Sequence, residues 1–340
     1  MSRKINEKNE RVKRLYARWK AEARRADEKT VDKALDAVDR FSRHTDAKDF
    51  RNFSVEQAIS FKRALDETPS ARTGAPLAKA TVDGILRAVK DFFDWLADQP
   101  GYRSRIKRRD LEYFNLSAKD VRTAHASRFK RAPTLEQCGH VFRLMPEETM
   151  FDQRDKAIFA TLMLTGARDG ALSSFRLRNV DLIDGCIHQD ARNLKTKFAK
   201  SFSTWFFPVD PMYRVQLAAW ISVLRDKYLF GPSDALFPKP QMGLIDGAFA
   251  AVGLTRSPYG NAAKVREVVK RAFEAADLPA VNPHSFRDML VAHGSEVCSG
   301  PAAFKAWSMN LGHDSVVTTI SAYCNIPVSS QRDLMKRMWE

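Results

Sequence analysis

The stretch that most constrains this chain runs from Pro283 to Tyr323, close to its end. Pro283 is a natural first residue for a helix, and the two residues His284 and Arg287 that follow it are three positions apart, so they share one helix face. An imidazole beside a guanidinium suits an anionic oxygen, because Arg can bind phosphate through two parallel hydrogen bonds. Taken alone, the pair is better explained as a surface Arg and a satisfied His.

The rest of this stretch adds a second imidazole and a late phenol. Leu311-Gly312-His313 is followed by Thr318-Thr319 and then by Tyr323, after which no further tyrosine occurs. A phenol has a pKa of about 10, so it needs cationic neighbours to act as a nucleophile. The order His-x-x-Arg, Leu-Gly-His, Thr-Thr and Tyr resembles the tyrosine recombinases, the phage integrase family. The resemblance implies a mainly α fold with a small antiparallel β-sheet (α+β), arranged as a two-domain clamp.

Length and charge agree with a nucleic-acid partner. The chain has 340 residues, enough for two domains, and a formal net charge of +15, which favours a polyanion. No apolar run approaches the length of a membrane span, and the N-terminus lacks a signal-type apolar core. The four cysteines form no Cys-x-x-Cys pair, so neither a zinc site nor a disulfide framework is expected. We therefore expect a soluble cytoplasmic protein without cofactors, associated with the bacterial nucleoid when bound to DNA.

The first 132 residues divide into three parts. Residues 1–25 are dense in Arg and Lys, which is compatible with a DNA-contacting arm, a helix on a neighbouring subunit or a solvated terminus. Residues 26–98 hold three segments with apolar residues at the helical period, one opened by a capping box of Ser54 and Gln57. They resemble the family's helical core-binding (SAM-like) domain.

Residues 99–132 form the third part, a basic linker. Such a segment lies along a phosphate backbone or is simply solvated, and the sequence does not separate the two. The candidate DNA contacts in it are Arg105, Lys107, Arg108 and Arg109.

Residues 133–340 form the expected catalytic domain, which Thr134 and Gln137 open with a second capping box. A strongly apolar helix from Ala157 stops at Gly166, so Arg168 follows a firmly held helix end. An unpaired charge there is costly, which leaves either a bound phosphate or a salt bridge to Asp169 or Asp181. Leu164-Thr165-Gly166-Ala167-Arg168 resembles the family's first active-site Arg motif. The family's acidic residue three positions later is replaced by Ala171, and whether Asp169 substitutes for it stays open.

The next segment reads as a small sheet. Asp184-Gly185 is a hairpin turn between residues 180–182 and 186–188, and residues 202–209 form a third strand. The family holds a catalytic Lys between its second and third strands, which implies Lys195, with Lys197 as the alternative. Lys197 and Lys200 are also candidate phosphate contacts.

Farther along, we expect helices over residues 212–229 and 264–276, and a loop over the Gly-, Pro- and Ser-rich residues 231–262. The tail 330–339 suits a short amphipathic helix that docks on a neighbouring protomer or folds back on its own domain.

The resemblance implies a DNA recombinase that needs neither metal nor ATP. Arg168 and Arg287 would clamp the non-bridging oxygens of the scissile phosphate, and His313 would add a hydrogen bond. Tyr323 would attack phosphorus with help from His284 and form a 3′-phosphotyrosine bond, while Lys195 would protonate the departing 5′ oxygen. One extra residue between His313 and Tyr323, relative to the commonest family spacing, would rotate a helical side chain by about 100° unless a bulge absorbs it.

The implied partners are double-stranded DNA with specific recombination sites, three further copies in a homotetramer, and accessory DNA-bending proteins. The implied context is the integration of a mobile element. Two other functions remain open, namely DNA relaxation of the type IB topoisomerase kind and an inactive DNA-binding protein on the same fold.

Overall fold

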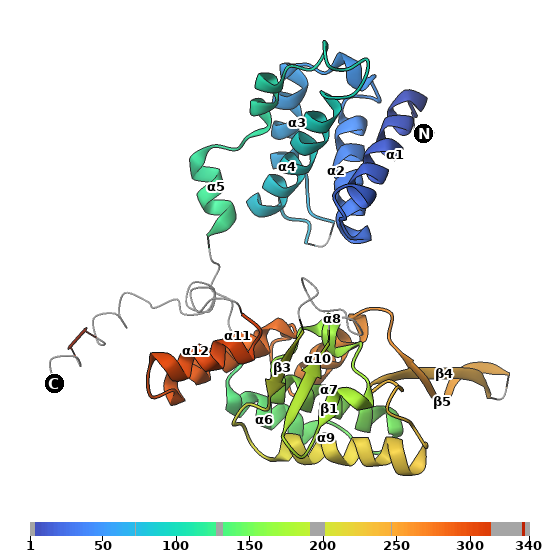
Figure 1. The fold of residues 1–340 in the computed structure, drawn as a ribbon, viewed down its shortest axis with the longest axis vertical. Helices are drawn as coiled ribbons and strands as arrows, with labels where there is room; N and C mark the ends of the chain where they lie inside the picture. Colours follow the sequence, from blue (N-terminus) through green and yellow to red (C-terminus); the bar gives the residue numbers. More distant parts are fainter. Residues whose placement is uncertain are drawn as a thin grey trace. The chain divides into compact units, whose positions relative to one another are not determined.

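The computed structural model describes residues 4–71, 73–126, 132–190, 201–245, 247–313 and 335–336. The chain divides into two compact units, Met1–Arg128 and Phe129–Glu340 (Figure 1). Both units are built mainly from helices, and the second adds small antiparallel sheets. The mainly α fold with a small sheet, expected from the sequence, is confirmed.

The first unit is a helical domain around an aromatic core. Phe41 packs edge-on against Phe61 and Phe93, with ring centroids 5.2 and 5.1 Å apart, a favourable arrangement of ring quadrupoles. The capping box of Ser54 and Gln57 forms and starts the third helix, as expected. The helices are α1 (Glu7–Glu22), α2 (Glu28–His44), α3 (Val55–Glu67), α4 (Lys79–Leu96) and α5 (Ala118–His125).

The basic N-terminus is part of this domain, which none of the three interpretations of residues 1–25 anticipated. Its helix α1 buries Val12 and Tyr16 in the aromatic core. Lys13 is buried as well and pairs with Glu10 and Asp39. The cations of this segment therefore cover a helix whose apolar face completes the unit's own core.

The segment after α4 also differs from the linker expected over residues 99–132. Its apolar side chains are buried in the core of the first unit, and they are Tyr102, Ile106, Leu111 and Phe114. The last two belong to a 3₁₀ helix, Arg108–Phe114. The basic residues between these positions are exposed. Because they outnumber the widely spaced apolar residues, the sequence suggested a linker instead of a segment packed on the core.

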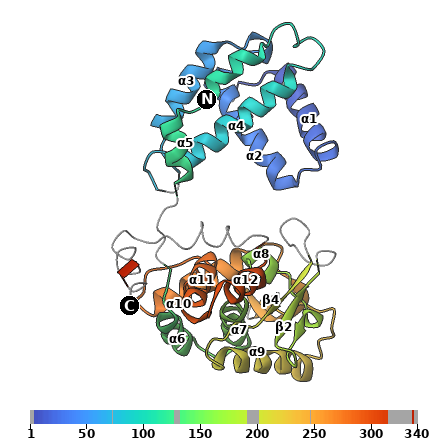
Figure 2. The ribbon, with the colours of Figure 1, turned by 60° about the vertical axis from the view of Figure 1, so that its left-hand side comes forward.

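The second unit is organised around α7 (Met150–Thr165), which is buried on every side from Arg154 to Thr165. A helix without a polar face needs neighbours all round, and α9 (Met212–Ser222) packs along it (Figure 2). A π-helical turn, Val223–Lys227, extends α9. The remaining helices are α6 (Leu135–Leu144), α8 (Asp169–Leu172), α10 (Ala263–Ala275), α11 (His284–Val297) and α12 (Pro301–Asn310).

The small sheet has the expected hairpin. β1 (Val180–Asp181) and β2 (Cys186–Gln189) pair antiparallel across a turn in which Gly185 has φ +66°, a conformation that suits Gly. β3 (Phe202–Trp205) pairs on the other side of β2, with Gln189 opposite Phe202. The order is therefore β1-β2-β3.

The prediction of a loop over residues 231–262 is wrong. β4 (Pro238–Ile245) and β5 (Ala248–Pro258) form a long antiparallel hairpin that projects from the unit (Figure 1). Asp246-Gly247 stands between the paired residues Ile245 and Ala248, and an Asp-Gly pair is a strong hairpin signal. The Gly, Pro and Ser content of the segment outweighed that signal in the sequence.

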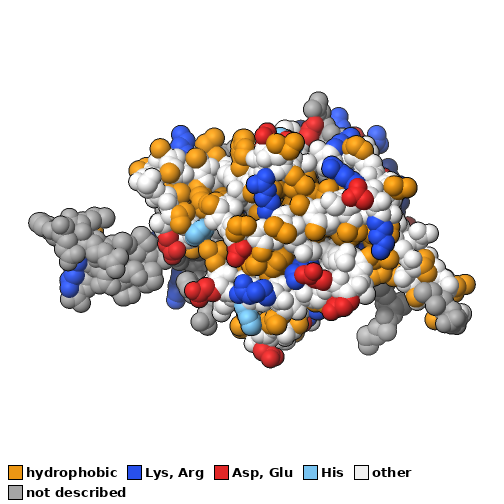
Figure 3. All heavy atoms as spheres, turned by 90° about the horizontal axis from the view of Figure 1, so that it is seen from below, with side chains coloured by type: hydrophobic (Ala, Val, Ile, Leu, Met, Phe, Trp, Pro, Cys, Tyr) orange, Lys and Arg blue, Asp and Glu red, His pale blue; other side chains and the backbone are white. Residues whose placement is uncertain are grey.

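The surface on the α9 side of the second unit carries mixed side chains. Lys and Arg are scattered among hydrophobic and neutral groups on this face (Figure 3), and Val215 of α9 is 66% exposed. Within the described part of the chain, no helix is long and apolar enough to cross a membrane.

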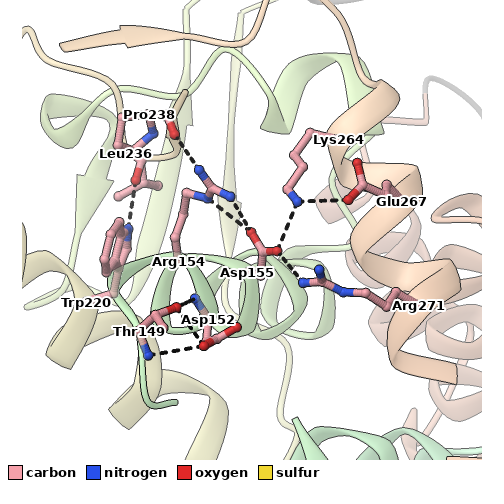
Figure 4. Close-up of polar contacts among 10 residues, drawn as sticks. All are labelled: Thr149, Asp152, Arg154, Asp155, Trp220, Leu236, Pro238, Lys264, Glu267 and Arg271. Atoms are coloured by element: carbon pink, nitrogen blue, oxygen red, sulfur yellow. Dashed lines mark hydrogen bonds and ion pairs between the residues drawn. The ribbon is translucent and has the colours of Figure 1, made fainter. Parts of the chain in front are cut away.

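A buried ionic network ties three parts of the second unit together (Figure 4). The Asp155 carboxylate of α7 accepts hydrogen bonds from Arg154 at 2.8 Å and from Arg271 of α10 at 2.7 Å, and Lys264 Nζ lies 3.1 Å away. Arg154 also donates to the Pro238 carbonyl oxygen at 3.0 Å. The network thus joins α7 to α10 and to the base of the β4–β5 hairpin.

Candidate active site

The site begins where α7 ends. Gly166 caps α7 in the left-handed region, with φ +55°, as helices often end. A Cβ atom on this residue would lie 2.9 Å from both Leu290 Cδ1 and Leu311 Cδ2. Both the backbone conformation and the close packing therefore favour Gly at this position. The end of α7 meets α11 and the turn after α12 there.

Arg287 of α11 joins these three segments. Its side chain is buried, with 2% of the residue exposed. Nη1 donates to the Gly166 carbonyl oxygen and Nη2 to the Leu311 carbonyl oxygen, both at 2.6 Å. Nη2 also lies 2.8 Å from His313 Nε2. Carbonyl acceptors fix the direction of a guanidinium without adding a full negative charge beside it.

His313 is held in a turn between α12 and the sheet. It is 7% exposed, and its backbone NH donates to the Ser308 carbonyl oxygen at 3.3 Å. Gly312 before it has φ +73°, and a Cβ atom there would come within 2.7 Å of the Phe202 ring. The turn therefore lies directly against the start of β3.

Arg168 lies two residues after Gly166, at the N-terminus of α8. It is partly buried, and its guanidinium has no hydrogen-bond or ion-pair partner among the described residues. The salt bridges considered from the sequence do not form, because Asp169 pairs with Arg266 at 2.6 Å and Asp181 caps its own turn. Arg168 thus remains available for an anion.

Ala171 occupies the position at which the resemblance leads to the expectation of an acidic residue. Ala171 is buried, with 4% exposed, so a carboxylate at that position would lose its hydration. Asp169 is the nearest acid along the chain, and it accepts from the Gly170 backbone NH at 2.8 Å as well as from Arg266 of α10. It anchors the first turn of α8 to α10, which holds the backbone next to Arg168.

His284 opens α11 one turn before Arg287. Its side chain is 50% exposed, and Nε2 lies 3.9 Å from Asp288 Oδ1. His293, farther along the same helix, packs on Trp307, and its Nε2 lies 3.4 Å from the Pro208 carbonyl oxygen. The described structure therefore brings Arg287 and His313 into contact. Arg168 lies two residues after Gly166, whose carbonyl oxygen binds Arg287, and His284 lies at the surface of α11, the helix that carries Arg287.

Four candidate residues lie outside the described residues, namely Lys195, Lys197, Lys200 and Tyr323. The positions that flank the three lysines are described. Gln189 pairs with Phe202, and the Phe202 ring packs on Gly312. The chain therefore enters and leaves the segment 191–200 near the turn that carries His313.

The candidate DNA contacts of the first unit are all exposed. Arg108 pairs with Asp94 of α4 at 2.8 Å and with Asp98, just after that helix, at 2.5 Å, and these carboxylates raise the pKa of its guanidinium. Arg109 lies 3.4 Å from Asp110, whereas Arg105 and Lys107 have no ion pair among the described residues. Exposed pairs are weak and exchange readily for a phosphate.

The sheet also brings together a thiol and an imidazole that sequence analysis did not single out. Cys186 Sγ lies 3.6 Å from His188 Nε2, and His188 Nδ1 lies 2.9 Å from Ser203 Oγ. Burial and the nearby Asp181 and Asp184 raise the pKa of the Cys186 thiol, which is opposite to what a nucleophile needs. Among the described residues, no group of three or more His, Cys, Asp or Glu could hold a metal ion.

Comparison with known proteins rests on structure. No family model and no curated protein matches the sequence. The integrase of transposon Tn1549, solved with transposon right-end DNA, is similar over 97% of this chain and 99% of its own, with 16% identity and a TM-score of 0.61. A lambda integrase dimer bound to a COC′ core site is similar over 92% and 94%, with 12% identity and a TM-score of 0.63.

A lambda integrase tetramer bound to a Holliday junction is also similar, over 90% of this chain and 76% of that one, with 13% identity and a TM-score of 0.60. Identities this low show the fold alone. The similarity nevertheless extends over 90–97% of this chain, and thus over both units. The resemblance read from the motifs is confirmed at that level: this chain has the fold of the tyrosine recombinases.

Proposed function

We propose that the protein is a site-specific tyrosine recombinase that cleaves and rejoins double-stranded DNA without metal or ATP. The observation that supports this function best is the position of Arg287. It binds the carbonyls of Gly166 and Leu311 and contacts His313. Three segments that resemble separate family motifs thus converge on one guanidinium.

The proposed chemistry uses fixed cations. Arg287 and Arg168 bind the non-bridging oxygens of one scissile phosphate, and His313 donates a hydrogen bond to the same group. The Tyr323 oxygen forms a bond to phosphorus while the bond to the 5′ oxygen breaks. The phenol proton passes to His284, whose exposed side chain is accessible to DNA, and the 5′ oxygen takes a proton from Lys195. Attack by a 5′-hydroxyl reverses the step.

Specific DNA and further copies of the chain complete the proposed assembly. Arg105, Lys107, Arg108 and Arg109 contact phosphates from the first unit, with Lys197 and Lys200 from the second. Four copies assemble on paired sites, as the tetramer described for lambda integrase on a Holliday junction suggests. Accessory DNA-bending proteins and a mobile element as the DNA source belong to the same proposal.

A nicked suicide duplex tests this function. Cleavage next to the nick releases a short strand, so an active enzyme stays covalently attached and migrates as a larger species in a denaturing gel. We expect the wild type to be trapped and the Tyr323→Phe variant to give no adduct. An adduct that persists in Tyr323→Phe would move the nucleophile to another residue, and absence of any wild-type adduct on its own DNA site would refute catalysis.

The site sequence is first obtained by selecting bound duplexes from a random pool. Relaxation of any supercoiled plasmid, without paired sites, would identify the topoisomerase activity instead. Joining of two sites only when both are present is the outcome that supports recombination.

A further inference from the structure

The last residue of α12, Asn310, connects the turn of His313 to the outer edge of the small sheet. Its side-chain Nδ2 donates to the Trp205 carbonyl oxygen, and its Oδ1 accepts from the Trp205 backbone NH, both at 2.8 Å. β3 is an edge strand in the order β1-β2-β3, so these main-chain groups have no further strand beside them in that sheet. The Asn310 amide pairs with them as a neighbouring strand would.

A second bond strengthens the same junction. The Asn310 carbonyl oxygen accepts from Thr204 Oγ1 at 3.1 Å, and Thr204 Oγ1 in turn accepts from Gln189 Nε2 at 3.0 Å. Thr204 and Gln189 are buried, with 1% and 5% exposed. Buried polar chains of this kind hold their members in one arrangement, because a broken bond leaves a desolvated group.

The residues after Asn310 lead directly into the site. The Leu311 carbonyl oxygen accepts from Arg287, Gly312 packs on the Phe202 ring, and His313 contacts Arg287. The turn is therefore held on one side by Arg287 and on the other by β3. Without the Asn310 amide, the sheet side would keep the packing of Phe202 on Gly312, the Thr204 bond to the main chain and the contact of Trp307 with Phe207, none of which pairs with the edge of β3 at Trp205.

We propose that Asn310 is a positioning residue, which sets the location of His313 by fixing the turn 311–313 to the edge of β3. This role rests on the proposed recombinase function and goes beyond the residues assigned to it. Asn310 does not touch the phosphate, so its effect on the rate passes through His313. A displacement of about 1 Å in a catalytic group can cost on the order of a hundredfold in rate.

A double-mutant cycle on the suicide duplex tests this role. Asn310→Ala removes both amide bonds, and we expect DNA cleavage to slow by roughly 10- to 100-fold with unchanged DNA affinity. In a His313→Gln background the same change should cost less than about threefold, because the group it positions is already absent. Met309→Ala is the matched control, since Met309 precedes Asn310 on α12 and is 58% exposed; it should cleave at the wild-type rate.

Further variants distinguish positioning from general damage. Asn310→Asp keeps the acceptor for the Trp205 NH but places a carboxylate oxygen against the Trp205 carbonyl oxygen, where Nδ2 donated, so its rate should fall at least as far as that of Asn310→Ala. If Asn310→Ala does not fold, Asn310→Asp takes its place in the cycle. Wild-type cleavage by Asn310→Ala, or an equal loss in both backgrounds, would overturn the proposal.

A modified substrate adds a last discrimination. Sulfur in place of the bridging 5′ oxygen leaves as a thiolate, whose thiol has a pKa of about 8.5, so no proton donor is needed. This substrate should relieve the defect of Lys195→Ala but not that of Asn310→Ala. Rescue of Asn310→Ala by sulfur would place its action on the leaving group and refute the role assigned through His313. If the wild type forms no adduct with either substrate, the proposed function itself fails.

Discussion

Two arginines of the second unit, Arg287 and Arg154, are equally buried, each with 2% exposed, yet their surroundings differ. Arg154 donates twice to the Asp155 carboxylate, at 2.8 and 3.0 Å. The partners described for Arg287 are two carbonyl oxygens and an imidazole. A buried cation is costly unless its charge is balanced, and the carboxylate beside Arg154 provides that balance within the protein.

We expect this difference to separate a cation that stabilises the fold, Arg154, from the cation proposed to act in the reaction, Arg287. The Asp155 network joins α7, α10 and the base of β4, and its charges are satisfied without a ligand (Figure 4). The carbonyl oxygens of Gly166 and Leu311 orient the Arg287 guanidinium, and in the proposed reaction this group binds the phosphate. Substitution in the Asp155 network should change mainly the stability of the protein, whereas substitution of Arg287 should change mainly the reaction rate.

The largest expected effect is on stability, at Asp155. Asp155→Ala leaves Arg154 buried next to Lys264 without the carboxylate that binds both, so the free energy of unfolding should fall by about 3–5 kcal/mol. Urea denaturation monitored by circular dichroism measures it. Asp152→Ala, on the same helix, removes a partly exposed first-turn carboxylate that closes a capping box with Thr149 and should cost only about 1 kcal/mol. Equal losses for the two variants would contradict the structural role.

Arg287→Ala should have the largest effect on rate. Loss of one group that stabilises the transition-state charge typically slows a reaction by about a hundred- to a thousandfold. Adduct formation on the suicide duplex gives the rate, and fluorescence anisotropy checks that DNA still binds. Arg154→Leu is the comparison variant, and its folded fraction should cleave at the wild-type rate. A normal rate in Arg287→Ala, or a comparable loss in Arg154→Leu, would break the distinction between the two arginines.

Gly166 stands at the boundary between α7 and the site, and Gly166→Ala should affect both properties. A side chain at φ +55° is strained, and its Cβ would lie 2.9 Å from Leu290 and Leu311, so we expect a loss of about 1–3 kcal/mol in unfolding free energy. The carbonyl that orients Arg287 would shift, which lowers the cleavage rate too. A Cβ atom on Gly170 would meet no atom within 4 Å, and this residue has no positive φ; Gly170→Ala should leave stability unchanged or slightly higher. Stability of the Gly166 variant equal to that of the wild type would argue against the tight helix end.

Local signals in the sequence predicted much of this fold. The capping boxes at Ser54 and Thr134 form and start α3 and α6, because such caps depend on residues only three positions apart. The same holds for the Asp184-Gly185 hairpin and for the end of α7 at Gly166. The predictions for residues 99–132 and 231–262 differed from the structure because composition masked a local signal, namely the apolar residues of the segment 102–114 and the Asp-Gly pair between Ile245 and Ala248. In residues 1–25 the many cations likewise masked the apolar face of α1.

The site was only partly predictable, for a different reason. Motif order singled out Arg168, Arg287 and His313 as candidates, but it did not predict the contacts of Arg287 with residues 121 and 24 positions away. The Asp155 network likewise depends on Arg271, 116 positions along the chain, and Asn310 reaches Trp205 over 105 positions. Such pairs form only when tertiary packing brings two elements together, and no periodicity or cap in the sequence marks them.

The smallest effect should come from Arg271, the exposed member of the Asp155 network. Its guanidinium lies 2.7 Å from Asp155 but its side chain is 57% exposed, so solvent screens the pair and the Arg271→Gln variant should lose at most about 1 kcal/mol. Arg154, which is 3% exposed in its side chain, continues to balance the carboxylate. The same urea titration should therefore rank Asp155→Ala far above Arg271→Gln, with cleavage unchanged in the latter. A loss in Arg271→Gln as large as that in Asp155→Ala would mean that solvent exposure of the guanidinium does not weaken its contribution to this network.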